Sequence, residues 1–282
     1  IIYVALDAAE RAKLQDRARW QRAAGAIVEE LSAAEARKLE PAISPEVVFA
    51  LHLPDNRRTD NRKLTQAYAN AAVRAGANFV EGAMVEEVVV RHGHAAGVRM
   101  HDGTVCESDI VINAAGSWAG ELRGLEADHV KTHPVRGQIV CFETRPGILG
   151  PAVFSLRGYV VPRRDGRLLA GSTMEEAGYN KSVTLAGMEK ILRAANDMVP
   201  SLAAIPFREA WAGLRPATND LLPVLGVSPA VPNVFYATGH FRSGILLSAL
   251  TGEILADVVK GRKPPIDLAP FSPARFNSHT GR

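Results

Sequence analysis

Residues 233–248, NVFYATGHFRSGILLS, begin as an apolar run of strand type, pass through Gly239 and continue as an apolar helical pattern. A glycine-bounded turn that opens a helix leaves backbone N–H groups free at the positive end of the helix dipole. Arg242 adds a guanidinium at this point, although a cation near a helix N-terminus costs roughly 0.3–1 kcal/mol. The stretch therefore predicts a strand, turn and helix whose junction attracts anions.

A second junction of the same kind occurs at residues 109–122, DIVINAAGSWAGEL. Here a buried-type strand meets Ala114, Ala115 and Gly116, and Ser117 follows in the N-cap position expected for a short helix. Small residues at such a turn let a ligand approach the backbone, although the same pattern is common in turns with a purely structural role. Two such junctions predict a crevice at the carboxyl ends of strands in an open α/β sheet.

The remaining pattern predicts a mixture of helices and short strands. Ser32 and Glu35 have capping-box spacing, and Asp60 precedes an amphipathic run that ends at Gly76. Helices are expected over 7–24, 61–76, 183–199 and 244–261, an antiparallel meander over 84–113, and a mixed sheet over 137–214. The fold class is therefore α/β, mixed with α+β features.

Composition excludes several function classes. The 282 residues are 47% hydrophobic and carry a formal charge of +3, with basic residues scattered along the chain. Nucleic acid and membrane are therefore not expected as partners. Cys106 and Cys141 lie far apart, which predicts no disulfide framework and a reducing, cytoplasmic setting. His92 and His94 fit a hairpin turn better than a metal pair, so no metal is predicted.

Five motifs together identify a resemblance. INAAGSWAG, HPVRGQIV, YVVPRRDGRLLAGSTM, WAGLRPATNDLLPVLG and GHFRSGILL follow one another along the chain. In this order and spacing the chain resembles the D-amino acid oxidase family of FAD-dependent oxidoreductases, and among its members the glycine oxidases of thiamine biosynthesis. By themselves, Tyr159 and Met174 would be read as a half-buried sheet residue and a core residue.

The resemblance implies roles for the substrate site. Arg242 is implied to pair with the substrate carboxylate through its planar fork, and Tyr159 to donate a hydrogen bond to the same group. Arg215 lines the pocket and assists, while Met174 forms a wall that favours small substrates. His240 lies beside Arg242 and has two readings, a catalytic base or a histidine held in the turn by local hydrogen bonds; the second is preferred because hydride transfer needs no base.

The resemblance also implies a cofactor site for FAD, bound non-covalently because no cysteine lies near the last helix. Val85 matches a position near the adenine end of the cofactor. The N–H groups at the head of the last helix are implied to face the pyrimidine edge of the flavin. The implied cofactor-binding residues are Val85, Ala115, Gly116, Trp118, Gly239, His240, Arg242, Ser243, Gly244 and Ile245.

The implied activity is oxidation of glycine, sarcosine or small D-amino acids, with hydride passing from the α-carbon to the flavin. The products are an oxo-acid, ammonia or an amine, and hydrogen peroxide from oxygen. Two alternatives stay open. One is an amine dehydrogenase or demethylase that uses another electron acceptor, and the other is an inactive fragment that binds a small carboxylate without flavin. A homo-oligomer is expected.

The chain departs from the family at its phosphate loop. No G-x-G-x-x-G stretch between a strand and a helix is present, so we expect the chain to be the last three-quarters of a longer protein. The expected FAD-binding Rossmann-like remainder comprises 59–130 and 218–282. It is interleaved with a substrate domain on a largely antiparallel mixed sheet, residues 1–58 and 131–217.

Overall fold

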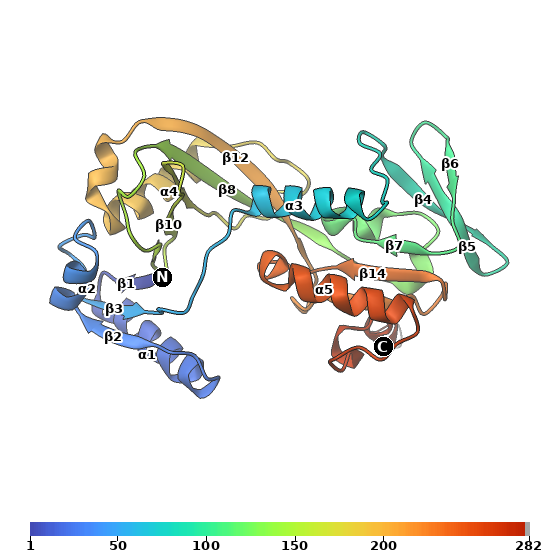
Figure 1. The fold of residues 1–282 in the computed structure, drawn as a ribbon, viewed down its shortest axis with the longest axis horizontal. Coiled ribbons are helices and arrows are strands. Elements are labelled where there is room, and N and C mark those ends of the chain that lie inside the picture. The colour runs from blue at the N-terminus through green and yellow to red at the C-terminus, as the bar shows by residue number, and fades with distance from the viewer. Residues whose placement is uncertain (280–282) are drawn as a thin grey trace. The chain divides into compact units, whose positions relative to one another are not determined.

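The computed structural model describes residues 1–279, and its contacts divide the chain into two compact units. The first unit comprises residues 1–64, 136–175 and 180–213. The second unit comprises residues 65–135, 176–179 and the chain from Leu214 onward. Each unit is therefore assembled from three separate segments of the sequence (Figure 1). The assignment of one unit to the flavin and the other to the substrate stays a prediction.

An eight-stranded sheet forms the frame of the first unit. In spatial order its strands are β12 (Phe207–Ala217), β8 (His133–Glu143), β11 (Arg167–Gly171), β10 (Tyr159–Pro162), β9 (Val153–Phe154), β1 (Ile2–Ala5), β3 (Phe49–His52) and β2 (Glu29–Ser32). The pair β1–β9 is parallel, whereas β1–β3, β2–β3, β9–β10, β10–β11 and β8–β11 are antiparallel. The mixed, largely antiparallel sheet expected from the middle of the sequence is thus confirmed.

Side chains cap three helices of the first unit, and the sequence predicts one of these caps, the Ser32–Glu35 capping box. The carboxylate of Asp7 accepts a 2.7 Å hydrogen bond from the backbone N–H of Glu10 at the start of α1 (Ala8–Ala23). Ser32 and Glu35 form the expected capping box before α2 (Ala33–Leu39). The hydroxyl of Thr184 accepts from Gly187 N at the start of α4 (Leu185–Met198). Each such cap contributes about 1 kcal/mol by satisfying a free helix N–H.

The core of the first unit lies between α4 and the sheet. Ile191, Ala195 and Met198 of α4 pack in one buried cluster with Val160 of β10 and Leu168 of β11. Val160, Leu168 and Met198 are fully buried. Burying a side chain of this size stabilises the fold by roughly 1.5–3 kcal/mol, so this cluster fixes α4 against the strands.

Two three-stranded sheets form the second unit. The first is the predicted antiparallel meander of β4 (Val85–Arg91), β5 (His94–Met100) and β6 (Val105–Glu107). The second has the order β13 (Val224–Val227), β14 (Val234–Thr238) and β7 (Val111–Asn113). In it β13 and β14 are antiparallel, whereas β14 and β7 are parallel. The carboxyl ends of β7 and β14 therefore point the same way.

The remaining helices are α3 (Asn61–Arg74), α5 (Gly244–Val259), η1 (Gly116–Glu121), η2 (Glu126–Asp128), η3 (Pro200–Ala204), η4 (Ala269–Phe271) and η5 (Pro273–His279). In Figure 1, α5 lies along β14, and these two elements contact each other. None of the helices within residues 1–279 is both long enough and apolar enough to span a bilayer.

A buried carboxylate ties the second unit together. Asp128 is fully buried and accepts hydrogen bonds of 2.8 Å from the hydroxyls of Ser228 and Tyr236 and one of 3.0 Å from Ala230 N. Burial, and then the Asp128 charge, raise the pKa of the Tyr236 phenol. A buried carboxylate is costly unless several donors satisfy it, so this cluster joins η2 firmly to β14 and to the end of β13.

Two local predictions differ from the structure. The expected N-cap role of Ser117 is wrong: η1 begins at Gly116 without a side-chain cap, and Ser117 lies inside it. The positive φ of 58° at Gly116 lets the chain turn one residue earlier than expected. The sequence also did not predict β2, whose largely polar residues 29–32 form a strand because β3 supplies its hydrogen-bonding partners.

Candidate active-site residues

The turn between β14 and α5 is held in one shape by close packing. Gly239 has φ 73°, and a Cβ there would lie 3.0 Å from the Thr218 side chain and 3.3 Å from the carbonyl oxygen of Leu222. Phe241 also has a positive φ of 47°, and its backbone N–H donates a 2.9 Å hydrogen bond to the carbonyl of Pro216. The turn therefore needs glycine at its start and is fastened to the end of β12.

Arg242 projects from this turn with its charge uncompensated. It is exposed, and within residues 1–279 it forms no ion pair and no side-chain hydrogen bond. The following helix, α5, starts at Gly244, and no side chain caps its first turn. A guanidinium and free helix N–H groups together form a site for negatively charged groups.

His240 is held in the same turn. The Nε2 of His240 lies 2.9 Å from the hydroxyl oxygen of Thr251. A hydroxyl group can either donate a hydrogen bond to a ring nitrogen or accept one from it. Burial lowers the pKa of the His240 imidazole, so the neutral form is favoured. A neutral ring that shares a hydrogen bond with α5 stabilises the position of the turn beside Arg242.

Arg215 belongs to the same unit as this turn. It is half-buried on β12 and directly precedes Pro216, whose carbonyl receives the hydrogen bond from Phe241. Arg215, His240 and Arg242 are therefore brought into one neighbourhood by the contact between the end of β12 and the turn. Nothing in the local sequence predicts that particular backbone contact.

The second predicted junction lies beside the first. The hydroxyl of Thr238 at the end of β14 donates a 2.9 Å hydrogen bond to the carbonyl of Gly116, which follows β7. The amide of Asn113 donates to the carbonyl of Ala119, which closes η1 back onto β7. The parallel pairing of β7 and β14 thus places both glycine turns at the carboxyl ends of neighbouring strands, on the same side of the sheet, as the sequence predicts.

This edge retains groups that a cofactor could use. The hydroxyl oxygen of Ser117 is buried and has no hydrogen-bond partner in the structure. Trp118 is 47% exposed and stacks on Tyr179 with ring centroids 5.4 Å apart, while Ile245 on α5 is 51% exposed. An unsatisfied polar atom costs about 1–3 kcal/mol, which a bound ligand would remove. The residues present therefore fit a large, partly apolar cofactor.

Tyr159 and Met174 belong to the first unit. Tyr159 starts β10 and pairs with Gly171 of β11, and a Cβ at Gly171 would lie 2.8 Å from the Tyr159 hydroxyl oxygen. The half-buried phenol ring therefore lies across Gly171, with Phe154 on its other side at a centroid distance of 5.4 Å. Met174 is 52% exposed and lines a cavity of about 600 Å³ together with Ser172 and Lys190.

A buried polar network that sequence reasoning missed holds the segment that carries Met174. Arg136 and Glu175 exchange two backbone hydrogen bonds of 2.9 and 3.0 Å and form a partly buried ion pair through their side chains. Gln138 is fully buried, and its backbone N–H donates to the hydroxyl of Thr173. The HPVRGQIV motif contains both Arg136 and Gln138, and their alternation along a buried strand was the available signal.

The predicted site residues thus fall on two units. Tyr159 and Met174 lie on the first, whereas Arg215, His240 and Arg242 lie on the second. The predicted cofactor residues Val85, Ala115, Gly116, Trp118, Gly239, Ser243, Gly244 and Ile245 all lie on the second unit. Among these, the turns at Gly116 and Gly239 are in direct contact through Thr238, whereas Val85 lies at the start of the meander.

Comparison with known proteins shows extensive similarity. Residues 1–258 match the family of FAD dependent oxidoreductases. The chain is 33% identical to a glycine oxidase from Geobacillus kaustophilus over 262 residues. This aligned region covers 92% of this chain and 69% of that protein. It is 36% identical over 243 residues to the hydrogen cyanide synthase subunit HcnC from Pseudomonas aeruginosa, covering 86% of this chain. The match spans 58% of the length of that subunit.

Solved structures show the same relationship. The crystal structure of the glycine oxidase from Geobacillus kaustophilus superimposes with a TM-score of 0.91 at 31% identity, over 97% of this chain and 74% of that one. Iminodiacetate oxidase (IdaA) from Chelativorans sp. BNC1 gives a TM-score of 0.85 at 27% identity, over 96% and 74% of the two chains. The mixed α/β fold predicted from the sequence is confirmed by these similarities.

Proposed function

The chain belongs to the family of FAD-dependent oxidoreductases, and from that premise we propose that it oxidises glycine, sarcosine or a small D-amino acid. The observation that carries the proposal is the exposed guanidinium of Arg242 at the head of α5, which is unpaired within residues 1–279 and lies on a turn bonded to Pro216, next to Arg215 in sequence. Similarity to glycine oxidase over most of the chain supports the choice of a small amino acid as substrate.

Arg242 is proposed to bind the substrate carboxylate. A guanidinium can donate two parallel hydrogen bonds to a carboxylate, which fixes the orientation of the amino acid as well as its position. Arg215 adds a second positive charge near the same turn. Tyr159 and Met174 of the first unit are proposed to contact the carboxylate and to limit the size of the side chain, respectively.

The second unit is proposed to hold FAD without a covalent bond. The buried hydroxyl of Ser117 would form a hydrogen bond with the cofactor. The N–H groups of Gly244 and Ile245, which no side chain caps, would face the negatively charged edge of the flavin. When bound, FAD would supply the oxidation, as acceptor of a hydride from the substrate α-carbon and donor of two electrons to oxygen, with hydrogen peroxide as product. Val85 is proposed to contact its adenine end.

The chain need not supply a base. His240 is favoured in its neutral form but shares its Nε2 hydrogen bond with Thr251, so that nitrogen is engaged. We therefore propose that the substrate amine binds already deprotonated and that the imine product hydrolyses to an oxo-acid and ammonia. The role of the protein is orientation of the amino acid and stabilisation of charge.

A second candidate follows from the Pseudomonas relative, which is named as a subunit of hydrogen cyanide synthase. In that case the chain would act as one subunit of an assembly, and the product would be cyanide instead of an oxo-acid. Oxygen uptake, peroxide and glyoxylate would identify the oxidase. Cyanide, or turnover that requires an artificial electron acceptor, would identify the alternative.

The primary test is the absorption spectrum of the purified chain with added FAD, followed by anaerobic glycine. A bound-flavin spectrum that bleaches with glycine and recovers with air is the expected result. Failure to retain FAD would overturn the proposal for this chain. The free thiols of Cys106 and Cys141 support a cytoplasmic location, and a homo-oligomer stays a prediction that light scattering can test.

A further inference from the structure

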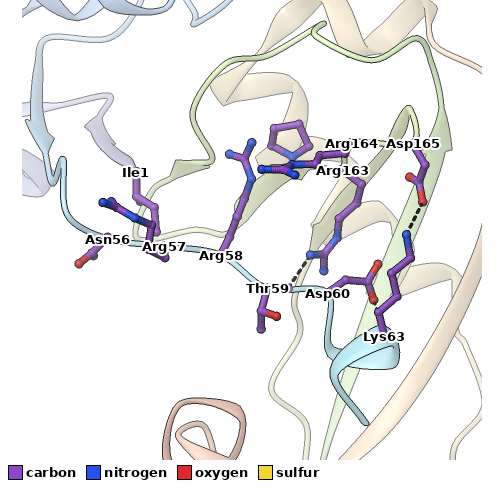
Figure 2. Close-up of a pocket in the computed structure, with 11 residues that line it drawn as sticks. Ile1, Asn56, Arg57, Arg58, Thr59, Asp60, Lys63, Arg163, Arg164 and Asp165 are labelled. Atoms are coloured by element: carbon purple, nitrogen blue, oxygen red, sulfur yellow. Dashed lines mark hydrogen bonds and ion pairs between the residues drawn. The ribbon is translucent and has the colours of Figure 1, made fainter. Parts of the chain in front are cut away.

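A cavity of about 530 Å³ lies entirely within the first unit, apart from every residue assigned above. Most of its lining comes from two segments far apart in the sequence, with Ile1 beside them (Figure 2). One is residues 56–60, which lead into α3, and the other is the turn 162–165 between β10 and β11. Its most frequent lining residue is arginine: Arg57, Arg58, Arg163 and Arg164 all contribute.

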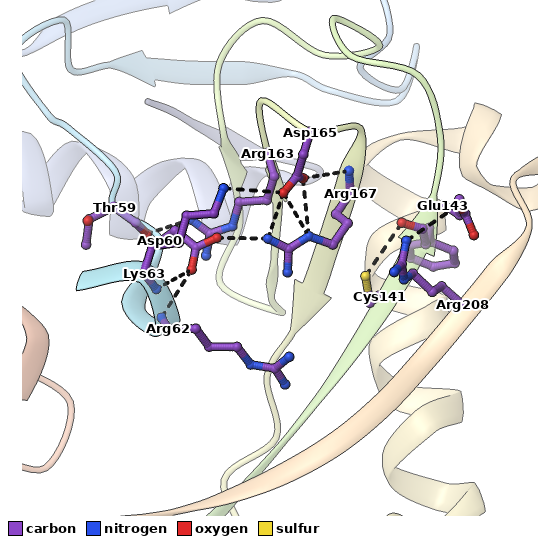
Figure 3. Close-up of polar contacts among 11 residues, drawn as sticks. Thr59, Asp60, Arg62, Lys63, Cys141, Glu143, Arg163, Asp165, Arg167 and Arg208 are labelled. Atoms are coloured by element: carbon purple, nitrogen blue, oxygen red, sulfur yellow. Dashed lines mark hydrogen bonds and ion pairs between the residues drawn. The ribbon is translucent and has the colours of Figure 1, made fainter. Parts of the chain in front are cut away.

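The two carboxylates of this cavity are already neutralised (Figure 3). Arg167 donates 2.9 Å hydrogen bonds to both Asp60 and Asp165, and the ammonium of Lys63 lies 3.7 Å from Asp165. The hydrogen bond from Arg167 is the main reason that the pKa of Asp165 falls to about 2. Two negative charges are thus matched by two positive ones, and this ion cluster fastens the 162–165 turn to the start of α3.

The four lining arginines are not paired in this way, although the charge of Arg163 also helps to lower the pKa of Asp60. Within the described residues, none of Arg57, Arg58, Arg163 and Arg164 forms an ion pair with a carboxylate. Three of them donate one hydrogen bond each to a backbone carbonyl: Arg57 to Pro54 (2.8 Å), Arg58 to Gly150 (3.2 Å) and Arg163 to Thr59 (2.6 Å). Backbone carbonyls orient the side chains and leave the other guanidinium N–H groups free.

Two further observations favour the binding of an anion. The Nε of Arg163 is buried and has no hydrogen-bond partner among residues 1–279. The pKa of Arg58 is lowered first by burial and then by the charges of Arg163 and Arg164, so these cations repel one another across the cavity. Figure 2 shows the Arg58 and Arg164 guanidinium groups turned toward the same space. Gathering like charges in one partly buried place is unfavourable until a counter-ion binds.

We propose that this cavity binds a small molecule that carries two or more phosphate-type charges, with Arg58, Arg163 and Arg164 as its principal donors. Guanidinium groups match phosphate oxygens bidentately, and a single carboxylate would neutralise only one of the four arginines. The volume suits a small metabolite. None of the described lining residues is aromatic, so the cavity offers no stacking surface for a nucleobase and does not fit single-stranded nucleic acid.

The test is isothermal titration of the purified chain with pyrophosphate at constant ionic strength, in a buffer without phosphate. We expect one saturable site, weaker binding of inorganic phosphate, and no binding of acetate. Arg163→Ser and Arg164→Ser should each lower the affinity for pyrophosphate at least tenfold. The matched control is Arg208→Ser in the same unit, where Arg208 is exposed and lies 3.5 Å from the carboxylate of Glu143; it should bind as the unchanged chain does.

Arg163→Lys separates an effect on folding from an effect on ligand binding. It keeps the positive charge but removes the planar guanidinium, which can donate two parallel hydrogen bonds. It should retain the thermal unfolding midpoint of the unchanged chain and still bind several-fold more weakly. Titration is repeated with saturating FAD, which carries a pyrophosphate of its own. Binding that persists would support a separate site, whereas competition by FAD, absence of saturation, or equal weakening in Arg208→Ser would overturn the proposal. These outcomes are independent of amine oxidation.

Discussion

Thr238 donates a 2.9 Å hydrogen bond from its hydroxyl to the carbonyl oxygen of Gly116, and this bond joins the two strand–glycine–helix junctions of the second unit. Thr238 is buried, with 1% of its surface exposed, so water cannot replace the donor. The positions of the two proposed flavin-facing turns therefore depend on one another.

Thr238→Val should uncouple the two turns. Valine has nearly the shape of threonine but lacks the hydroxyl donor, so the carbonyl of Gly116 loses its hydrogen bond. An unsatisfied buried carbonyl lowers the free energy of unfolding by about 1–3 kcal/mol. Denaturant unfolding should show a loss in that range, and the affinity for FAD, measured by quenching of flavin fluorescence, should fall. Thr104→Val in the exposed turn before β6 is the control. An unchanged FAD affinity at reduced stability would contradict the coupling.

Arg242→Lys should raise KM for glycine by roughly ten- to a hundredfold, because the ammonium keeps the charge but cannot bind a carboxylate through two parallel hydrogen bonds. Steady-state kinetics with oxygen as acceptor provide the measurement. Arg19→Lys, on the exposed face of α1, is the matched control. If kcat alone fell and KM were unchanged, Arg242 would not be the carboxylate anchor.

Gly239→Ala and Gly261→Ala form a matched pair, because both glycines have positive φ, 73° and 68°. A Cβ at Gly239 meets the Thr218 methyl at 3.0 Å, whereas nothing lies within 4 Å of a Cβ at Gly261. Backbone strain alone costs about 1 kcal/mol, so Gly239→Ala should lose roughly 1–2 kcal/mol more than Gly261→Ala. Equal losses in urea unfolding would show that the turn at Gly239 can relax.

Asp220 should make stability depend on pH. Burial would raise the pKa of its carboxylate, but hydrogen bonds from Arg275 and neighbouring groups outweigh it and lower the pKa to about 2. A depressed pKa in the folded state adds stability above the unfolded value near 3.8, and this is lost as pH falls from about 4 to 2. After allowance for solvent screening of a half-exposed pair, the effect is roughly 1 kcal/mol.

The measurement is the free energy of unfolding of Asp220→Asn at several pH values. The variant should be less stable than the unchanged chain at pH 7, and the difference should shrink toward pH 2. Asp109→Asn, at an exposed carboxylate, serves as the control. A difference that stays constant with pH would assign the effect to packing.

Local chemistry explains why much of the secondary structure could be predicted. The Asp7 cap and the Ser32–Glu35 capping box are interactions between residues three positions apart, so the sequence contains both partners. The turn glycines are similarly local, because the need for a positive φ at Gly239 is met by the residue itself. The N-cap assignment of Ser117 failed because Gly116 and the contact with Thr238 moved the start of η1.

The candidate site required information that no local pattern contains. Arg136 and Gln138 were visible as polar residues in a buried strand, but their partners Glu175 and Thr184 lie about forty positions away. The same holds for the arginine cavity, in which residues 56–60 meet 162–165. Whether the charge of an arginine is neutralised depends on which carboxylate lies beside it in the folded chain. Such pairs join residues far apart in the sequence, so a local sequence pattern does not predict them.

By itself the sequence determined the main helices, most of the strands and the two glycine junctions, because periodicity, caps and turn residues act within a few positions. The flavoenzyme family was indicated by the resemblance of its motifs to known sequences. Tertiary structure alone decided that β7 and β14 run parallel, that Thr238 joins their turns, and that four arginines line one cavity whose two carboxylates are paired with Arg167 and Lys63. The physical reason is that hydrogen-bond and charge partners are chosen by distance in space, and distance in space is set by the packing of segments remote in sequence.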